Sequence, residues 1–363
     1  MYYYWLHNVP GIGRRSMQTI LKYISAKGLY ESNSNQLEKI LNEKQVNNVL
    51  RSKSEWKINI EWEILQRKKI QVIGLLEKEY PTKLSQINDP PPILYVKGKK
   101  DILNKPSVAV IGARGCSNYG SLMAKELGRQ LAAMGIVVVS GMARGVDSIC
   151  QSSCLEYGGE SIAVLGSGVE VCYPPEHKRL YEELQIKGAL VSENLPYTKP
   201  APGLFPLRNR IISGLADIVV VVEAREKSGT LNTVDAALEQ GKEIYAIPGR
   251  ISDPVSKGCN QLIKQGAGMI LSVEEFLAEI CPMLSVKYER VVETMATNLS
   301  SEEKSILTVL DVNYKTIEEI YSMIKKEHPS MTIIGLMELL LELQMKQLIK
   351  EEGGYYFRYK LKK

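Results

Sequence analysis

Glycine-rich turns beside arginines are the residues of this chain whose types and spacing point to chemistry. Between residues 106 and 280 the sequence repeats an apolar run, a turn of small residues and a helical stretch, and the turns are 112–115, 140–145, 165–168, 206–210 and 228–231. Glycine lets backbone N–H groups approach a ligand, and the partial positive charge at the start of a helix attracts phosphate. Because this combination of a glycine-rich turn and a helix start recurs, the pattern predicts a site for a chain of phosphates.

The arginines in these turns are the first candidates for phosphate ligands. Arg114 directly follows the first apolar run, and Arg144 takes the equivalent place after the second. A guanidinium there can reach past the strand end and donate two hydrogen bonds to one phosphate. Arg208 and Arg210 lie two residues apart where a helix starts, so their side chains diverge. We expect one of them to face the ligand and the other to pair with an acid; which one stays open.

Polar and aromatic groups near the same turns complete the predicted site. Ser117 begins the helix after the first turn, and Ser228 and Thr230 begin another; each hydroxyl either caps its helix or contacts the ligand. The remaining candidate ligands are Gly112, Asn118, Ser140, Gly141, Lys199, Asn209, Gly229 and Asn260. Single-stranded nucleic acids also stack their bases on aromatic rings. The candidates for stacking are Tyr119, Tyr173, Tyr197 and Phe205.

The apolar runs predict how these turns are positioned. Strands are expected at 93–96, 108–111, 136–139, 161–165, 190–192, 218–222 and 244–247, with helices between most of them. Continuous apolar strands that alternate with helices indicate a mainly parallel sheet covered on both faces. We therefore predict a Rossmann-like α/β domain over residues 76–281, with its repeating core from residue 106. The turns then share the carboxyl edge of the sheet, where such folds bind ligands.

The first 75 residues predict a small helical domain, because their apolar residues recur at helical spacing and no strand pattern is visible. Residues 9–16 resemble a helix-hairpin-helix, in which a Gly-x-Gly hairpin offers its amides to a DNA phosphate. Gly11, Gly13, Arg14 and Arg15 are the residues of a secondary DNA contact under this interpretation. The alternative is a structural hairpin that does not touch DNA.

The last part of the chain follows a linker expected at 282–299. Residues 300–303 carry a helix-capping signature, helices are expected near 302–311, 316–326 and 331–345, and a β-hairpin with a Gly-Gly turn follows at 348–357. This order resembles a winged helix, a fold that often binds duplex DNA. The helix at 331–345 contains Glu338 and Glu342 and no Arg or Lys. A phosphate backbone attracts cations, so we expect this domain to contact protein or to pack.

Composition narrows the class of protein. Residues 1–105 carry 18 Lys+Arg against 10 Asp+Glu, residues 106–281 carry 16 against 19, and residues 282–363 carry 12 of each. Binding to a polyanion therefore depends on focused arginines, helped by the basic amino-terminal part. The six cysteines form no CxxC pair, the start of the chain does not resemble a signal peptide and no apolar run is long enough for a membrane span. We expect a cytoplasmic protein with buried thiols and without a metal or cofactor.

Residues 106–281 also resemble the DNA-processing protein A family, called DprA or Smf. The stretches that carry the resemblance are GARGCSNYG (112–120), SGMARGVD (140–147), LGSGVEVCYPPEH (165–177), SEN (192–194), FPLRNRIISGLAD (205–217), VVEAREKSGTLNT (221–233), AIPGR (246–250) and KGCNQLIKQGA (257–267). The resemblance implies a dimeric protein that binds and shields single-stranded DNA and loads a RecA-type recombinase during natural transformation. It implies no catalytic activity. Gln151 and His177 stand where the family more often has histidine and asparagine, and we expect altered local packing there.

Two enzymatic interpretations are less well supported. A nicotinamide-dependent dehydrogenase needs GxGxxG at its first turn and an acid after its second strand. Here the first turn reads GARGCSNYG and the second strand ends in Ser140 and Gly141. The domain also resembles the lysine decarboxylase-like phosphoribohydrolases, which release a base from a nucleotide. Thr233 stands where their catalytic glutamate is expected, so this hydrolase remains the alternative to DNA binding.

Overall fold

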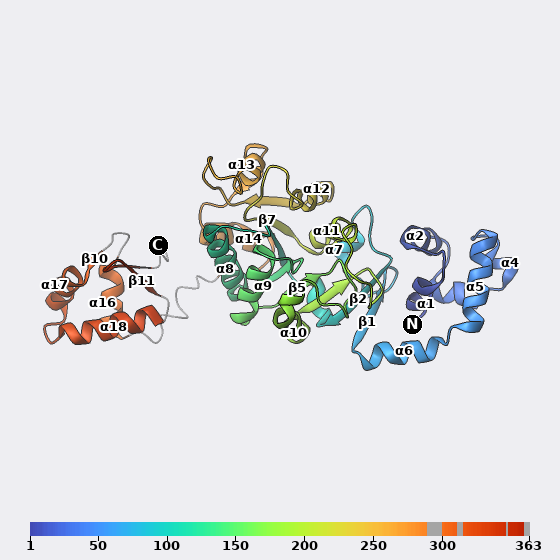
Figure 1. Ribbon diagram of the computed structural model, residues 1–363, viewed down its shortest axis with the longest axis horizontal. Helices are drawn as coiled ribbons and strands as arrows, with labels where there is room; N and C mark the ends of the chain where they lie inside the picture. The colour runs from blue at the N-terminus through green and yellow to red at the C-terminus, as the bar shows by residue number, and fades with distance from the viewer. Residues whose placement is uncertain (289–299, 311–314, 346–347, 359–363) are drawn as a thin grey trace. The chain divides into compact units, whose positions relative to one another are not determined.

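The computed structural model describes residues 1–288, 300–310, 315–345 and 348–358. It divides into two compact units, Met1–Tyr288 and Glu289–Lys363. In Figure 1 the first unit contains the large central sheet, and the second contains a small sheet of its own. No helix in the described part of the chain is both long and apolar enough to cross a membrane.

The central sheet has nine strands in the order β1-β2-β6-β5-β4-β3-β7-β8-β9. The strands from β6 to β9 in this order are parallel to their neighbours, whereas β1, β2 and β6 pair antiparallel. The strand bounds are β1 Ile70–Gly74, β2 Ile93–Gly98, β3 Ser107–Ile111, β4 Val137–Ser140, β5 Ser161–Val164, β6 Ala189–Ser192, β7 Ile218–Val221, β8 Glu243–Ala246 and β9 Gly268–Met269. The Rossmann-like parallel sheet predicted from the apolar runs is confirmed.

Both faces of the sheet are buried, as the apolar strands require. Along β3, Ala109 and Ile111 join one buried cluster, whereas Val108 and Val110 join another on the opposite face. Helices α11, α12 and α13 cover the first face, and α8, α9 and α14 cover the second (Figure 1). The bounds of the helices that follow β1 are α7 Thr82–Ser85, α8 Asn118–Ala133, α9 Val146–Glu156, α10 Lys178–Lys187, α11 Leu204–Leu215, α12 Leu231–Glu239, α13 Lys257–Lys264 and α14 Val273–Met283.

The amino-terminal segment is helical as far as Arg67. Its helices are α1 Tyr2–Asn8, α2 Arg14–Leu21, α3 Ala26–Glu31, α4 Ser34–Leu37, α5 Glu43–Glu55 and α6 Ile58–Arg67. The prediction that residues 1–75 contain no strand is wrong, because Ile70–Gly74 forms β1 and pairs antiparallel with β2. The β-branched residues Ile70, Val72 and Ile73 favour a strand at this position.

Aromatic side chains join these helices to the sheet. Trp5 and Tyr95 are fully buried in one cluster that spans α1 and β2. His7 Nδ1 lies 2.9 Å from the Tyr95 hydroxyl, and burial lowers the pKa of His7 to about 4. The amino-terminal helices therefore share a core with the Rossmann-like sheet.

The second unit has the element order predicted for a winged helix. Its elements are α16 Ser301–Val309, β10 Lys315–Thr316, α17 Ile317–Glu327, α18 Ile333–Met345, β11 Ile349–Glu352 and β12 Tyr355–Arg358. Ser300 and Glu303 form the expected capping box, and Gly353 and Gly354 have positive φ in the hairpin turn. The linker predicted at 282–299 begins too early, because Pro282 and Met283 complete α14, and residues 289–299 lie outside the described residues.

Candidate nucleic-acid interface

The turns that follow the parallel strands touch one another along the carboxyl edge of the sheet. An added Cβ on Gly145, in the turn after β4, would lie 2.3 Å from the Ala113 carbonyl oxygen in the turn after β3. The Thr230 hydroxyl, in the loop after β7, donates to the Gly112 carbonyl at 3.2 Å. The prediction that these segments share one edge is therefore confirmed.

Among the four arginines predicted as ligands at this edge, Arg114 is the most available. Its side chain is exposed, and its guanidinium carbon lies 5.8 Å from the centre of the Phe205 ring. It forms no ion pair with any residue that the structure describes. A cation held over an aromatic face keeps its charge and its outward N–H donors. Arg114 can therefore donate to a phosphate without first leaving an acidic partner.

A small cavity lies directly beside Arg114. It is lined by Arg114, Gly141, Ala143, Arg144, Tyr173, Pro174, Phe205 and Arg208. Its volume of about 20 Å³ is close to the space that one water molecule needs. The rings of Tyr173 and Phe205 have centroids 5.5 Å apart and form one side of it. This arrangement combines cations with two aromatic surfaces, which are the components of a site for a single nucleic-acid strand.

Arg144 is exposed on the same cavity but already has an acidic partner. Its Nε lies 2.5 Å from Glu176 Oε1, and about half of each side chain is exposed. The pair raises the pKa of Arg144 and lowers that of Glu176. Exposed ion pairs of this kind contribute about 0–1 kcal/mol. A phosphate can therefore compete with Glu176 for Arg144, a competition that the sequence alone did not indicate.

Arg208 points into the protein, which corrects its place among the predicted ligands. It is 5% exposed and donates to the carbonyl oxygens of Gly141 and Val164, while its Nε donates to Asn209 Oδ1 at 3.3 Å. Burial lowers its pKa to about 10, and the nearby charge of Asp147 opposes that shift. Arg208 therefore holds the turn after β4 against the end of β5, and Asn209 serves it as an acceptor.

Arg210 and Arg14 are also held by acids. Arg210 Nη2 lies 2.6 Å from Glu193, and its Nε lies 3.1 Å from Asp89. Arg14 pairs with the same oxygen of Asp89, and its hydrogen bond contributes to lowering the pKa of Asp89 to about 2. Arg210 is therefore the arginine of the two that pairs with an acid, as expected, whereas Arg208 lines the cavity with its donors turned to backbone carbonyl groups. In the hairpin Arg15 is exposed and, unlike Arg14, forms no ion pair with a described residue. Gly11, with φ 78°, and Gly13 are also exposed and shape the turn before α2.

Internal carboxylates occupy the backbone donors that were predicted to bind phosphate. Glu223, which is 2% exposed, accepts from the Ser117 N–H at 2.8 Å and from its hydroxyl at 2.5 Å. Asp147 accepts from the amides of Gly141 and Ala143 at 3.1 and 3.4 Å, and burial raises its pKa. Helix starts and turns of exposed amides attract negative charge. The protein itself supplies that charge at these two turns.

Several other predicted ligands stabilise the loops instead. Ser140 is fully buried and donates to the Val110 carbonyl at 2.7 Å. Asn260 exchanges hydrogen bonds with both backbone groups of Gly249, at 3.2 and 3.0 Å. A Cβ on Gly141 would lie 2.5 Å from the Arg208 guanidinium, and a Cβ on Gly112 would lie 2.6 Å from the Val146 side chain. Glycine therefore lets these side chains pack against the two turns. These positions therefore support the edge from inside rather than contact a ligand.

The remaining predicted ligands lie on the surface of this edge. Asn118 starts α8 and is exposed, as are Lys199 and Gly229. Nothing within 4 Å would meet a Cβ on Gly229, so the space in front of it is open. Ser228 and Thr230 are half-buried, and their hydroxyls bond to each other at 3.0 Å. Asn118, Lys199 and Gly229 therefore remain candidates beside Arg114 and Arg144.

The two residues that depart from the family pattern act on one turn. Gln151, which is fully buried, accepts from the Met142 N–H at 3.0 Å and donates to Ser161 and Ile162. His177 Nδ1 lies 3.0 Å from the Met142 carbonyl, to which it can only donate. Met142 has φ 53°, an unusual conformation for a residue other than glycine. Gln151 and His177 thus fix the turn that presents Arg144.

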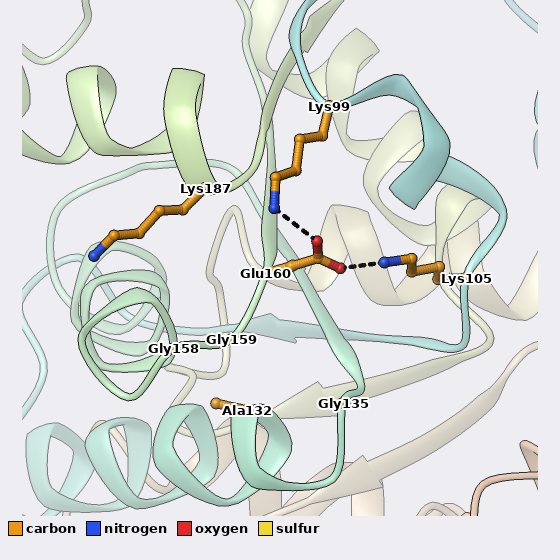
Figure 2. Close-up of a pocket in the computed structure, with 8 residues that line it drawn as sticks. All are labelled: Lys99, Lys105, Ala132, Gly135, Gly158, Gly159, Glu160 and Lys187. Atoms are coloured by element: carbon orange, nitrogen blue, oxygen red, sulfur yellow. Dashed lines mark hydrogen bonds and ion pairs between the residues drawn. The ribbon is translucent and has the colours of Figure 1, made fainter.

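A larger cavity of about 330 Å³ lies at the opposite edge of the sheet (Figure 2). Lys99 and Lys105 bind the two oxygens of Glu160 at 3.0 and 2.6 Å, and Lys187 donates to the Leu155 carbonyl at 3.3 Å. Helices α8, α9 and α10 all end beside this cavity. Lysines favour helix carboxyl ends because these carry partial negative charge. The lysines are explained by this local charge, and we assign no ligand to the cavity.

Comparison with known proteins matches this architecture to one family. Residues 71–281, which contain the whole carboxyl edge, match the family of DNA recombination-mediator protein A. The chain belongs to this family. Among curated members, the DNA processing protein DprA of Streptococcus pneumoniae is 41% identical over 211 residues, 58% of this chain and 74% of that protein. The DprA of Bacillus subtilis is 39% identical over 220 residues, 60% of this chain and 74% of that protein.

Solved structures of DNA processing protein A share the fold. The Streptococcus pneumoniae structure has a TM-score of 0.68 and 32% identity, and the match covers 79% of this chain and 98% of that one. A Helicobacter pylori structure, described as giving insight into its single-stranded DNA binding mode, has a TM-score of 0.55 and 29% identity over 59% of this chain and 97% of that one. The resemblance to DNA-processing protein A that the sequence motifs carried is confirmed.

Proposed function

We propose that this protein binds single-stranded DNA along the carboxyl edge of its central sheet. The observation that carries the proposal is Arg114, an exposed cation over Phe205 beside a cavity that Tyr173 also lines. Arg114 and Arg144 supply charge for phosphates, and the two rings supply stacking surface for bases. Stacking contributes about 1–3 kcal/mol per base on such platforms. The single-stranded DNA binding mode named for the Helicobacter pylori relative supports this choice of ligand.

We infer a single strand rather than a duplex from the side chains and the charge of the candidate surfaces. The cavity beside Arg114 is lined by the rings of Tyr173 and Phe205, and the unpaired bases of a single strand can stack on aromatic rings. Duplex readers usually place a helix or strands in a groove, with cations on the phosphates. The helix at that position in the winged-helix-like unit, α18, presents Glu338 and Glu342 and no Arg or Lys.

The finer role that we propose is protection of incoming single strands and loading of a RecA-type recombinase in natural transformation. The family description as a recombination mediator supports a recombinase as partner. We also propose that the protein acts as a homodimer in the cytoplasm and holds DNA without breaking bonds. The phosphoribohydrolase alternative is disfavoured because Thr233, at the position of the expected catalytic glutamate, is a hydroxyl residue only 3% exposed.

Substitution of Arg114 tests the proposal. Binding of a fluorescent oligothymidylate to the wild-type protein and to Arg114→Ala is measured by anisotropy over a salt series. Each phosphate neutralised on a single strand contributes about 0.7 to the slope of log affinity against log salt, so we expect Arg114→Ala to lower the slope by about that amount. Lys264→Ala, which removes an exposed charge from the last turn of α13, should leave it unchanged. An unaltered slope in Arg114→Ala, or tighter binding to duplex than to single strands, would contradict the proposal.

A further inference from the structure

Four exposed cations that no predicted site contains lie beyond the Arg114 cavity. They are Arg225 and Lys227 in the loop between β7 and α12, and Arg250 and Lys257 between β8 and the first turn of α13. We refer to these four residues as the β7–β8 rim. None of them forms an ion pair with a residue that the structure describes. By contrast, Arg179 on α10 pairs with Glu183 at 2.9 Å.

The β7–β8 rim is continuous with the Arg114 turn. The Gly258 N–H donates to the Ala224 carbonyl at 2.8 Å, which joins the start of α13 to the loop after β7. The Thr230 hydroxyl joins that loop to Gly112. The Tyr119 hydroxyl donates to the Pro248 carbonyl at 3.3 Å and so connects the start of α8 to the loop after β8. One surface therefore runs from the turn after β3 to the start of α13.

The charge of this surface favours a polyanion. The four cations stand against Glu226, which is exposed, and Asp253, which is half-buried and accepts from the Val255 N–H at 3.1 Å. Tyr119 lies between the Arg114 turn and the rim and is 46% exposed. The surface thus repeats the combination found at the Arg114 cavity, which is cations with an aromatic side chain beside them.

We propose that the β7–β8 rim is a second phosphate-binding segment, which extends the path of single-stranded DNA from the Arg114 cavity past Tyr119 to Arg250 and Lys257. The proposal rests on single-stranded DNA as the ligand of the carboxyl edge. Strands β4, β3, β7 and β8 are consecutive neighbours, and neighbouring strands lie about 4.8 Å apart. The path from β4 to β8 therefore measures about 14 Å, which matches about four stacked nucleotides at about 3.4 Å each.

A double variant separates the rim from the cavity. We expect Arg250→Ala combined with Lys257→Ala to lower the salt slope for an oligothymidylate of about 20 nucleotides by about 1.4, because two phosphates lose their cation. Arg114→Ala should lower it by about 0.7 in the same experiment. Lys125→Ala combined with Lys264→Ala removes the same charge from exposed positions of α8 and the last turn of α13 and should leave the slope unchanged.

Lysine footprinting tests the same proposal on the unaltered protein. The wild type is acetylated with and without the oligothymidylate, and modification is quantified by mass spectrometry. Protection of Lys227 and Lys257, with Lys125 and Lys264 unprotected, supports the rim. If Arg114→Ala lowers the slope but the rim variant keeps the wild-type slope and its lysines stay reactive, the rim is refuted and the proposed function stands. If the wild type shows no salt-dependent binding to single strands, the proposed function itself fails.

Discussion

Arg208 provides the sharpest test of how the carboxyl edge is built, because the sequence leaves its role open and the structure buries it. Replacing it by methionine keeps much of the side-chain volume but removes the donors to the Gly141 and Val164 carbonyls. It also removes the positive charge that opposes the rise in the pKa of Asp147 caused by burial. Breaking a buried charged contact of this kind typically costs about 3–5 kcal/mol.

The assay for Arg208→Met is thermal and urea unfolding of the wild type and the variant at neutral pH. At about 2 °C per kcal/mol for a unit of this size, the expected loss lowers the melting temperature by about 6–10 °C. We expect the salt slope of single-strand binding, measured where both proteins are folded, to remain that of the wild type. Arg114→Met should behave in the opposite way, with unchanged stability and a slope lower by about 0.7.

The two variants together give the outcome that would refute this reasoning. If Arg208→Met is as stable as the wild type within about 1 kcal/mol and its salt slope falls by about 0.7, then Arg208 contacts a phosphate. The buried arrangement of its guanidinium would then not be the one that binds DNA. An intermediate result, with lower stability and a lower slope, would also contradict a purely structural role.

Three further predictions concern other parts of the chain. The pKa of His7 is lowered by burial to about 4, so its stabilising contribution is complete above pH 6.5 and is lost as the pH falls towards 4. That loss amounts to about 3 kcal/mol, is measurable by urea unfolding, and should be absent in His7→Phe. Gln151→Leu leaves the Met142 N–H without its acceptor and should cost about 1–3 kcal/mol in the same assay; an unchanged midpoint would contradict this. Removing residues 289–363 should change single-strand affinity less than tenfold, about 1.4 kcal/mol, in the anisotropy assay.

The fold was predictable because its signals are local. The apolar runs at β3, β4 and β7 are bounded by small polar residues, so the sequence indicated both their extent and the parallel arrangement. β1 was missed because Gln71 interrupts a short run that follows a long helical stretch. Its partner β2 supplies the pairing that makes this segment a strand, and such pairing depends on residues distant in sequence.

The candidate site was only partly predictable, because the availability of a charge depends on its neighbours in space. Arg114 and Arg208 look alike in sequence, yet one lies exposed over Phe205 and the other is surrounded by carbonyl groups. No residue near Ser117 in the sequence indicates that its N–H group and hydroxyl donate to Glu223, more than 100 residues away. The exposed cations of the β7–β8 rim lie in three separate stretches of the sequence and become a group only when their loops meet.

The sequence by itself determined the family, the alternation of strands and helices, and the edge at which the glycine-rich turns gather. These properties follow from the spacing of hydrophobic residues within each segment and from the order of the segments along the chain, both of which are visible in the sequence. Only the tertiary structure decided which donors remain free for a ligand. A buried donor must find an acceptor wherever the fold brings one, and in this protein the acceptors for Arg208, Arg210 and Ser117 come from distant segments.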